Sequence, residues 1–173
     1  SEALKPFGVR NPLAPYLARE IGQYHTPDFE ETQSAQKVLD VTSALGGPGE
    51  YRVRFTHTEG YNGATVSRVA LVWSPKDRPQ QRTEVAVDKH HGVIGYTPKD
   101  PIYTLQLPAY DDALSYFVIA DLHAPRSSDK PVERQGCNGS ITLWKVRQPG
   151  EEIKPLPLLP MSESEKARYA APR

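Results

Sequence analysis

Hydrophobic and polar residues alternate through the middle of this chain. The clearest case is the segment 51–58, which places Tyr51, Val53, Phe55 and His57 on one face and arginines and threonines on the other. A period of two, rich in aromatic and β-branched residues, is typical of a half-buried strand. A Gly-Gly-Pro-Gly turn directly precedes it. The segment therefore predicts one strand of a sheet, entered through a tight turn.

The same pattern, or a short apolar run bounded by turn residues, recurs up to residue 146. No helical pattern separates these segments, which argues against a parallel architecture with crossover helices. Their spacing is typical of β-sandwiches, so we predict an all-β, antiparallel sandwich of jelly-roll type. The expected strands are 51–58, 65–73, 83–89, 102–107, 114–122 and 141–146, with a seventh that begins at residue 38.

The pattern also divides the chain into a central domain and two arms. We expect the sandwich to span residues 38–146, with an N-terminal arm, 1–37, packing on it. Apolar side chains between Leu13 and Ile21 fall at helical spacing, which indicates a short helix ending at Gly22. The remaining polar residues of this arm are expected to wrap the surface.

The C-terminal arm, 147–173, is proline-rich. Its first half is expected to be extended, because proline favours the polyproline conformation. Ser162 and Glu165 then form a capping box, which indicates a short helix over 162–170.

Composition excludes some classes of function. Lys+Arg and Asp+Glu both number 21, and this zero net charge argues against a nucleic-acid binder, which carries clustered basic charge. The single cysteine, Cys137, excludes an intrachain disulfide. No apolar run approaches the roughly 18 residues of a membrane span, and no signal peptide is visible at Ser1.

Short motifs follow one another in a set order between residues 38 and 145. They are Leu-Asp-Val-Thr at 39–42, Gly-Pro-Gly at 47–49, Tyr-Arg-Val-Arg-Phe at 51–55, Thr-Glu-Gly at 58–60, Val-Ala-Leu at 69–71, Asp88, His90, Gly92 and Gly95, and Tyr-Thr-Leu-Gln-Leu-Pro at 103–108. In their order and spacing they resemble the β-sandwich accessory domain of secreted bacterial glycoside hydrolases, β-N-acetylhexosaminidase-like enzymes among them. One departure is Gly-Cys-Asn-Gly at 136–139, where the family has a turn with an aspartate.

This resemblance implies a non-catalytic module, secreted, periplasmic or on the cell surface. Such a module binds a glycan or packs against a catalytic glycoside hydrolase domain, and needs no cofactor. The alternative is a structural or protein-interaction module without a sugar ligand, which the proline-rich arm favours. Fold alone does not decide between them.

A carbohydrate site would combine aromatic faces with polar groups. Tyr61 and Tyr96 fall in predicted loops, where they can stack on sugar rings while polar neighbours orient hydroxyls. The alternative is that both tyrosines are structural: Tyr61 packs over a sheet edge, and Tyr96 fills the open end of the β-sandwich. We predict a ligand site formed by Tyr61, Asn62, His90, Tyr96, Asp129 and Asn138.

The third hypothesis is a hydrolase or a metal-dependent enzyme centred on His90 and His91. No Glu-x-x-His motif or cysteine pair completes a metal set around them, and a metal site needs a third and a fourth ligand. No nucleophile-elbow motif is present either. We therefore expect no catalytic residue, no metal and no cofactor, and a protein that is not an enzyme.

Overall fold

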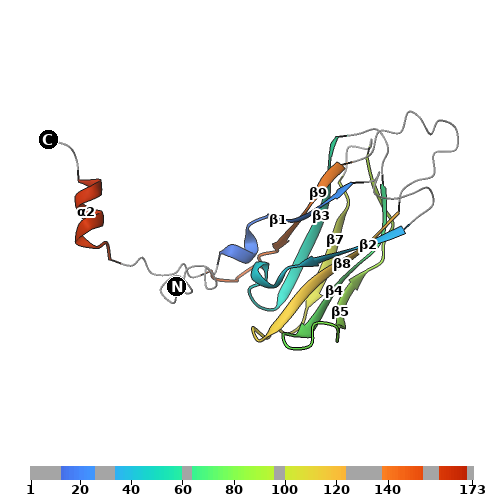
Figure 1. Ribbon diagram of the computed structural model, residues 1–173, viewed down its shortest axis with the longest axis horizontal. Coiled ribbons are helices and arrows are strands. Elements are labelled where there is room, and N and C mark those ends of the chain that lie inside the picture. Colours follow the sequence, from blue (N-terminus) through green and yellow to red (C-terminus); the bar gives the residue numbers. More distant parts are fainter. Residues whose placement is uncertain are drawn as a thin grey trace.

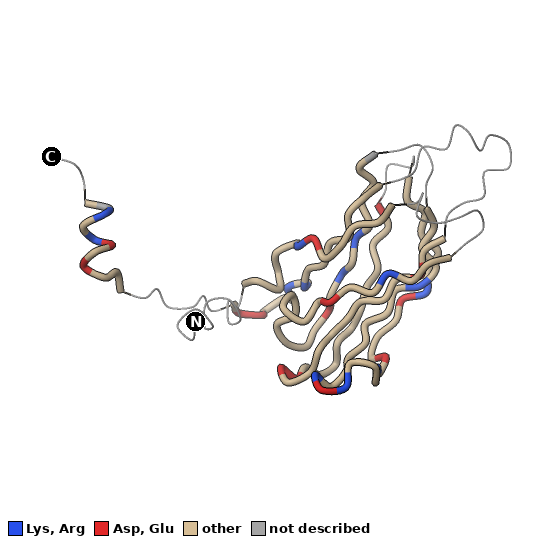
Figure 2. Tube along the Cα trace, in the orientation of Figure 1, with Lys and Arg blue, Asp and Glu red and all other residues tan. Residues whose placement is uncertain are grey.

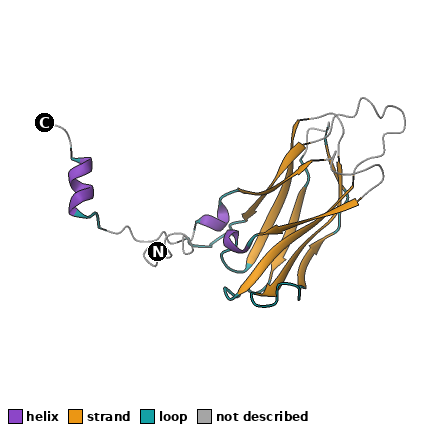
Figure 3. Ribbon diagram, viewed as in Figure 1, coloured by secondary structure: helices purple, strands orange, loops and turns teal. Residues whose placement is uncertain are grey.

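The computed structural model of this protein describes residues 13–25, 34–59, 64–95, 100–123, 138–153 and 160–170. Within these ranges nine strands form two antiparallel sheets, which face each other in a sandwich (Figure 1). This arrangement confirms the predicted all-β class. The described helical residues form two short turns at one end of the sandwich and one helix near the C-terminus that lies apart from it (Figure 3).

The first sheet has four strands. They are β1 (Arg19–His25), β9 (Asn138–Lys145), β3 (Gly49–Glu59) and β7 (Ile102–Leu107), in that spatial order. β3 lies between two partners, and its register pairs Val53 with Leu143 on β9 and with Tyr103 on β7. The first and last parts of the chain thus meet at the β1–β9 edge.

The second sheet has five strands. The main path is β2 (Ser34–Asp40), β8 (Leu114–His123), β4 (Ala64–Pro75) and β5 (Thr83–Asp88). The short strand β6 (Gly92–Ile94) pairs with the beginning of β4 and falls between two expected strands, 83–89 and 102–107. β6 forms there because it covers the part of the β4 edge that β5 leaves unpaired.

The core lies between the two sheets and follows the alternation in the sequence. Every second residue of β8 and β9 is buried, and the inward face of β3 carries Tyr51, Val53 and Phe55. Removing each such apolar side chain from water contributes roughly 1.5–3 kcal/mol to folding. Packing of the two inner faces therefore holds the sandwich together.

The N-terminal segment differs from the helix expected up to Gly22. The chain forms only a 3₁₀ turn, η2 (Ala14–Tyr16), and β1 begins at Arg19. β1 satisfies its backbone groups by pairing with β9 and buries Tyr24, which outweighs a helical spacing of a few apolar residues. The sheets thus begin at Arg19, before residue 38, and β2 also starts earlier, at Ser34.

Two further short helices are described. The 3₁₀ turn η4 (Thr42–Ala44) follows β2, and α2 (Glu163–Tyr169) occupies the position indicated by the capping box, with Glu165 N donating to Ser162 Oγ at 3.2 Å. α2 lies apart from both sheets (Figure 1). Among the residues described, none of the helices has the length and apolar character that crossing a bilayer requires.

The end of β9 is tied to both arms by a polar cluster. Lys145, only 8% exposed, donates to Tyr16 Oη at 3.2 Å and to Glu151 Oε1 at 3.4 Å. Tyr16 also donates to Glu151. Hydrogen bonds from Tyr16 and from the backbone N–H of Gln148, followed by the charge of Lys145, lower the pKa of Glu151 to about 2. The cluster joins η2, β9 and the segment after β9.

Candidate functional site

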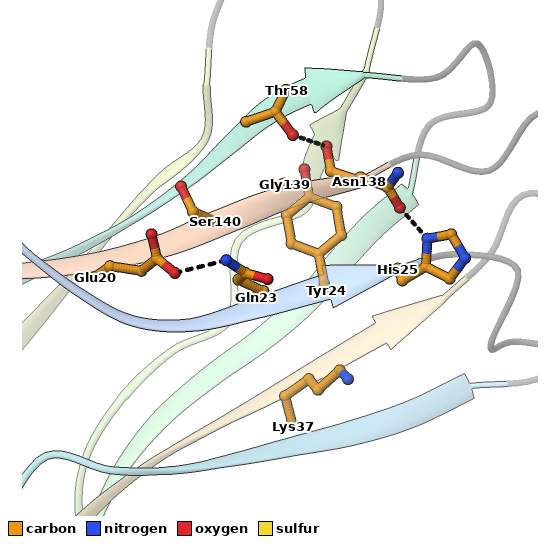
Figure 4. Close-up of a pocket in the computed structure, with 9 residues that line it drawn as sticks. All are labelled: Glu20, Gln23, Tyr24, His25, Lys37, Thr58, Asn138, Gly139 and Ser140. Carbon is orange, nitrogen blue, oxygen red and sulfur yellow. Dashed lines mark hydrogen bonds between the residues drawn. The ribbon is translucent and has the colours of Figure 1, made fainter.

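A pocket of about 560 Å³ opens where the edges of the two sheets come together. β1 forms one wall and β2, at the edge of the other sheet, faces it, while the start of β9 lies alongside β1 (Figure 4). The sheet edges approach closely here because Gly22 has no side chain: a Cβ there would lie 2.4 Å from Leu39 Cδ2. The lining residues are Glu20, Gln23, Tyr24, His25, Lys37, Thr58, Asn138, Gly139 and Ser140.

The floor of the pocket depends on Tyr24 and Gly139. The Tyr24 hydroxyl donates to the carbonyl of Thr56 at 2.7 Å, across the neighbouring strand. A Cβ on Gly139 would lie 2.1 Å from that hydroxyl and 1.7 Å from the same carbonyl. Glycine is therefore required for the ring to lie over β9. Because Tyr24 is only 2% exposed, its ring supports the pocket and offers no face to a ligand.

Where β1 ends and β9 begins, His25 and Asn138 are register partners. His25 Nδ1 and Asn138 Oδ1 are hydrogen-bonded, and Thr58 Oγ1 donates to the Asn138 carbonyl at 3.0 Å (Figure 4). These bonds hold the imidazole and the amide in fixed positions. A bound molecule would therefore meet oriented polar groups.

Charged groups of opposite sign stand on the two walls. Glu20 accepts from Gln23 Nε2 at 2.9 Å on β1, while the Lys37 ammonium extends from β2 toward the space between them (Figure 4). Lys37 is half-buried and makes no hydrogen bond or ion pair within the described part of the chain. The pocket thus offers both strong donors and strong acceptors without a large net charge.

Over the rest of the described chain, basic and acidic residues are interspersed (Figure 2).

His90, a predicted site residue, has a structural role at the opposite edge. Asp88 Oδ1 accepts from the backbone N–H of His90 at 3.2 Å and lies 2.7 Å from its Nδ1, and Asp88 Oδ2 accepts from Thr104 N at 2.9 Å. The His90 ring stacks on Tyr103, with centroids 4.0 Å apart. Desolvation acts to raise the pKa of Asp88, but the bonds from Thr104 and His90 together lower it. The contacts connect β5 to β7, one strand from each sheet.

Of the six predicted site residues, two lie within the described residues and four lie outside them. Asn138 lines the pocket, and His90 follows β5 on the other sheet. Tyr61, Asn62, Tyr96 and Asp129 lie outside the described residues, so the predicted grouping stays a prediction. The described ranges contain no group of three or more histidine, cysteine or acidic residues placed to hold a metal ion.

Sequence reasoning missed Glu20, His25 and Lys37. Each lies before the expected boundary at residue 38, in a segment where weak alternation gave little sign of a strand. Strand β2 does alternate, with Lys37 on its more buried side and Gln36 exposed. This alternation in burial and the facing of β1 and β2 both arise only in the folded sandwich.

The protein is therefore a β-sandwich domain with a polar pocket where the edge strands β1 and β2 of the two sheets meet. No protein-family model matches the chain, and no curated protein does. The resemblance to hexosaminidase-associated domains therefore stays a prediction.

Three solved structures that match this chain contain carbohydrate-binding modules. The CBM22-2 xylan-binding domain of Paenibacillus barcinonensis Xyn10C is 10% identical, with a TM-score of 0.34 over 63% of this chain and 70% of that one. The CBM22-1–GH10 modules of a Clostridium thermocellum xylanase, complexed with xylohexaose, are 9% identical, with a TM-score of 0.31 over 81% of this chain and 27% of that one. TmCBM61, in complex with β-1,4-galactotriose, is 13% identical, with a TM-score of 0.28 over 82% and 94%. Likenesses this remote assign neither a family nor a ligand.

Proposed function

We propose that this protein is a non-catalytic β-sandwich module that binds a glycan in the pocket between β1 and β2. The observation that carries the proposal is the polar pocket of about 560 Å³, with Lys37 on one wall and Glu20 on the other. Its volume lies within the roughly 300–1,000 Å³ of small-ligand sites. It is large enough for one or two sugar units.

The chemistry of the lining suits a polyhydroxylated ligand. Each sugar hydroxyl donates one hydrogen bond and accepts others, so a matching site needs both kinds of group. Lys37 donates and Glu20 accepts, while the Ser140 hydroxyl is already hydrogen-bonded to Thr56 Oγ1 at 2.6 Å. Because the Tyr24 ring is buried, binding here would rest on hydrogen bonds. Stacking on the sugar is the role we propose for Tyr61 and Tyr96.

We further propose an exported location and a catalytic glycoside hydrolase domain as the partner. Both follow from the motif resemblance between residues 38 and 145. In this arrangement the module would hold a polysaccharide chain close to the enzyme that cleaves it.

A glycan array tests the proposal. The wild-type protein is compared with Lys37→Met, with Tyr61→Ala/Tyr96→Ala, and with Lys166→Met as a matched control on α2, apart from the sheets. We expect glycan binding by the wild type and the control, and at least a tenfold loss in Lys37→Met. If only the Tyr61→Ala/Tyr96→Ala variant loses glycan binding, the binding site lies in the predicted loops and not in the pocket between β1 and β2. A folded wild type that binds no glycan would refute the proposal.

A second function has one observation in its favour. The side chains from Glu163 to Arg168 of α2 are exposed, and the helix lies apart from the sandwich. A structural or protein-interaction module would present such a helix to a partner chain. If the protein binds no glycan on the array, a pull-down tests this role. A purified catalytic domain of a glycoside hydrolase is used as bait, and the full chain is compared with one truncated after residue 153. Capture lost on truncation supports it, and equal capture contradicts it.

A further inference from the structure

A second pocket, of about 370 Å³, lies on the other side of the five-stranded sheet from the core, over β2, β8 and β4. Asp121 and His123 alternate with the buried residues of β8, so their side chains project away from the core. On β2, Ser34 pairs in register with His123 and Gln36 with Asp121. The lining residues are Ser34, Ala35, Gln36, Ser67, Asp121 and His123, and none of them belongs to the pocket between β1 and β2.

A β-bulge brings Ser67 into this pocket. The pairing of β4 with β8 slips between Val66 and Arg68, so Ser67 is the extra residue on its strand. Bulges redirect a side chain at the point where they occur. Ser67 Oγ consequently lies 3.1 Å from His123 Nε2. The Tyr103 hydroxyl donates to the Val66 carbonyl at 2.9 Å and holds the bulge from the core side.

Asp121 is the unusual group in the pocket. Its Oδ1 is buried and has no hydrogen-bond partner within the described part of the chain. Arg68, its register neighbour on β4, is bonded to Glu84 instead. A carboxylate oxygen removed from water without a partner destabilises a folded protein. Because Asp121 also lines the pocket, a bound cation can compensate the charge of its carboxylate, and the group is a candidate for ligand binding.

Serine, histidine and aspartate together are also the residue types of a hydrolase. In such an enzyme the carboxylate bonds to the histidine and orients it for proton transfer. No hydrogen bond joins Asp121 to His123 within the described residues, and Asp121 Oδ1 is buried there without a partner. The geometry favours binding over catalysis.

We infer that this pocket binds a protonated primary amine, with the Asp121 carboxylate as its counter-ion. An ammonium group has three donors and no acceptor, so it needs several oxygen acceptors around one negative charge. With the ring proton on Nδ1, His123 Nε2 accepts a hydrogen bond from the Ser67 hydroxyl, and Ser67 Oγ keeps lone pairs for the ligand. Gln36 and Ser34 supply the remaining oxygens.

The amine can belong to an amino sugar or to a flexible alkylamine such as a lysine side chain. The inference does not depend on the glycan pocket between β1 and β2, which shares no lining residue with this one. Lys37→Met is therefore expected to leave amine binding unchanged, and this separates failure of one proposal from failure of the other.

Titrations followed by ¹H–¹⁵N NMR test the inference. The full chain is titrated at pH 7 with glucosamine, with 1,5-diaminopentane, and with N-acetylglucosamine, which has no charged amine. We expect saturable shifts of the amide signals of Ser67, Asp121 and His123 with at least one amine and none with N-acetylglucosamine. The amine that binds identifies the source. No shift with either amine, or equal shifts with N-acetylglucosamine, would overturn the inference.

Asp121→Asn supplies the decisive variant. We expect its amine affinity to fall at least tenfold, and its thermal midpoint to equal or exceed that of the wild type, because an unpaired charge is removed. Asp77→Asn is the matched control: it makes the same charge change on an 80% exposed side chain in the turn after β4, and should bind as the wild type does. Should Asp121→Asn not fold, Ser67→Ala provides the same test, with a several-fold loss expected. Affinity unchanged in a folded variant contradicts the inference.

Discussion

Tyr103 connects the core to the bulge of β4, and its hydroxyl can be removed without changing the ring. The side chain is fully buried on β7, and its hydroxyl donates to the Val66 carbonyl at 2.9 Å, directly before the bulge. Desolvation, with a further contribution from the charge of Asp88, raises the pKa of Tyr103. The hydroxyl therefore stays protonated and remains a donor across the physiological pH range.

Replacing Tyr103 by Phe should destabilise the protein. A hydrogen bond contributes about 1 kcal/mol net, and a buried carbonyl left without its donor costs about 1–3 kcal/mol. With a urea m-value of roughly 2 kcal/mol/M, we expect the unfolding midpoint to fall by about 0.5–1.5 M with m unchanged. Urea unfolding followed by tryptophan fluorescence measures this directly.

Tyr110→Phe is the matched control. Tyr110 stacks on Tyr116, and its hydroxyl has no hydrogen-bond partner in the part of the chain that the structure describes. Its removal should shift the midpoint by less than about 0.3 M. If both variants shift equally, the bond to Val66 contributes nothing to stability, and the account of how the bulge is held is wrong.

Two further predictions concern the β1–β9 edge and the polar cluster at the end of β9. Gly139→Ala would place a Cβ 1.7 Å from the Thr56 carbonyl, so we expect a loss of about 1–3 kcal/mol or more in thermal unfolding; an unchanged midpoint would show that β3 and β9 are not packed this way. The pKa of Glu151 is about 2 in the folded chain and about 4.3 when unfolded, so its contribution to stability is present above roughly pH 4.5 and lost as the pH falls toward 2. In Glu151→Gln, the free energy of unfolding should fall less steeply between pH 4.5 and pH 2 than in the wild type. The same pH dependence in both proteins would contradict this role.

Local alternation was sufficient to predict most strands. Tyr51, Val53 and Phe55 occupy the inward face of β3 as the pattern indicated, and β7 was expected over 102–107, the range it occupies. A period of two needs no knowledge of the partner strand, because side chains alternate by backbone geometry alone. The fold class could be read for the same reason.

The N-terminal strands could not be read in this way. β1 is short and interrupted by Gly22, and its identity as a strand depends on pairing with β9, more than a hundred residues later. The capping box at Ser162 was readable because its bonds join residues three positions apart. Local hydrogen bonding leaves a signature in the sequence that distant pairing does not.

The candidate sites show the same division. The sequence by itself determined the residue types and most of the range of β8, a strand whose period of two puts Asp121 and His123 on one face. Only the tertiary structure decided that Lys37 and Glu20 line one pocket, that a bulge brings Ser67 to His123, and that Asp121 Oδ1 is buried without a partner among the described residues. The physical reason is that each of these sites depends on contacts between strands distant in sequence, and on a slip in register that only the paired strands reveal.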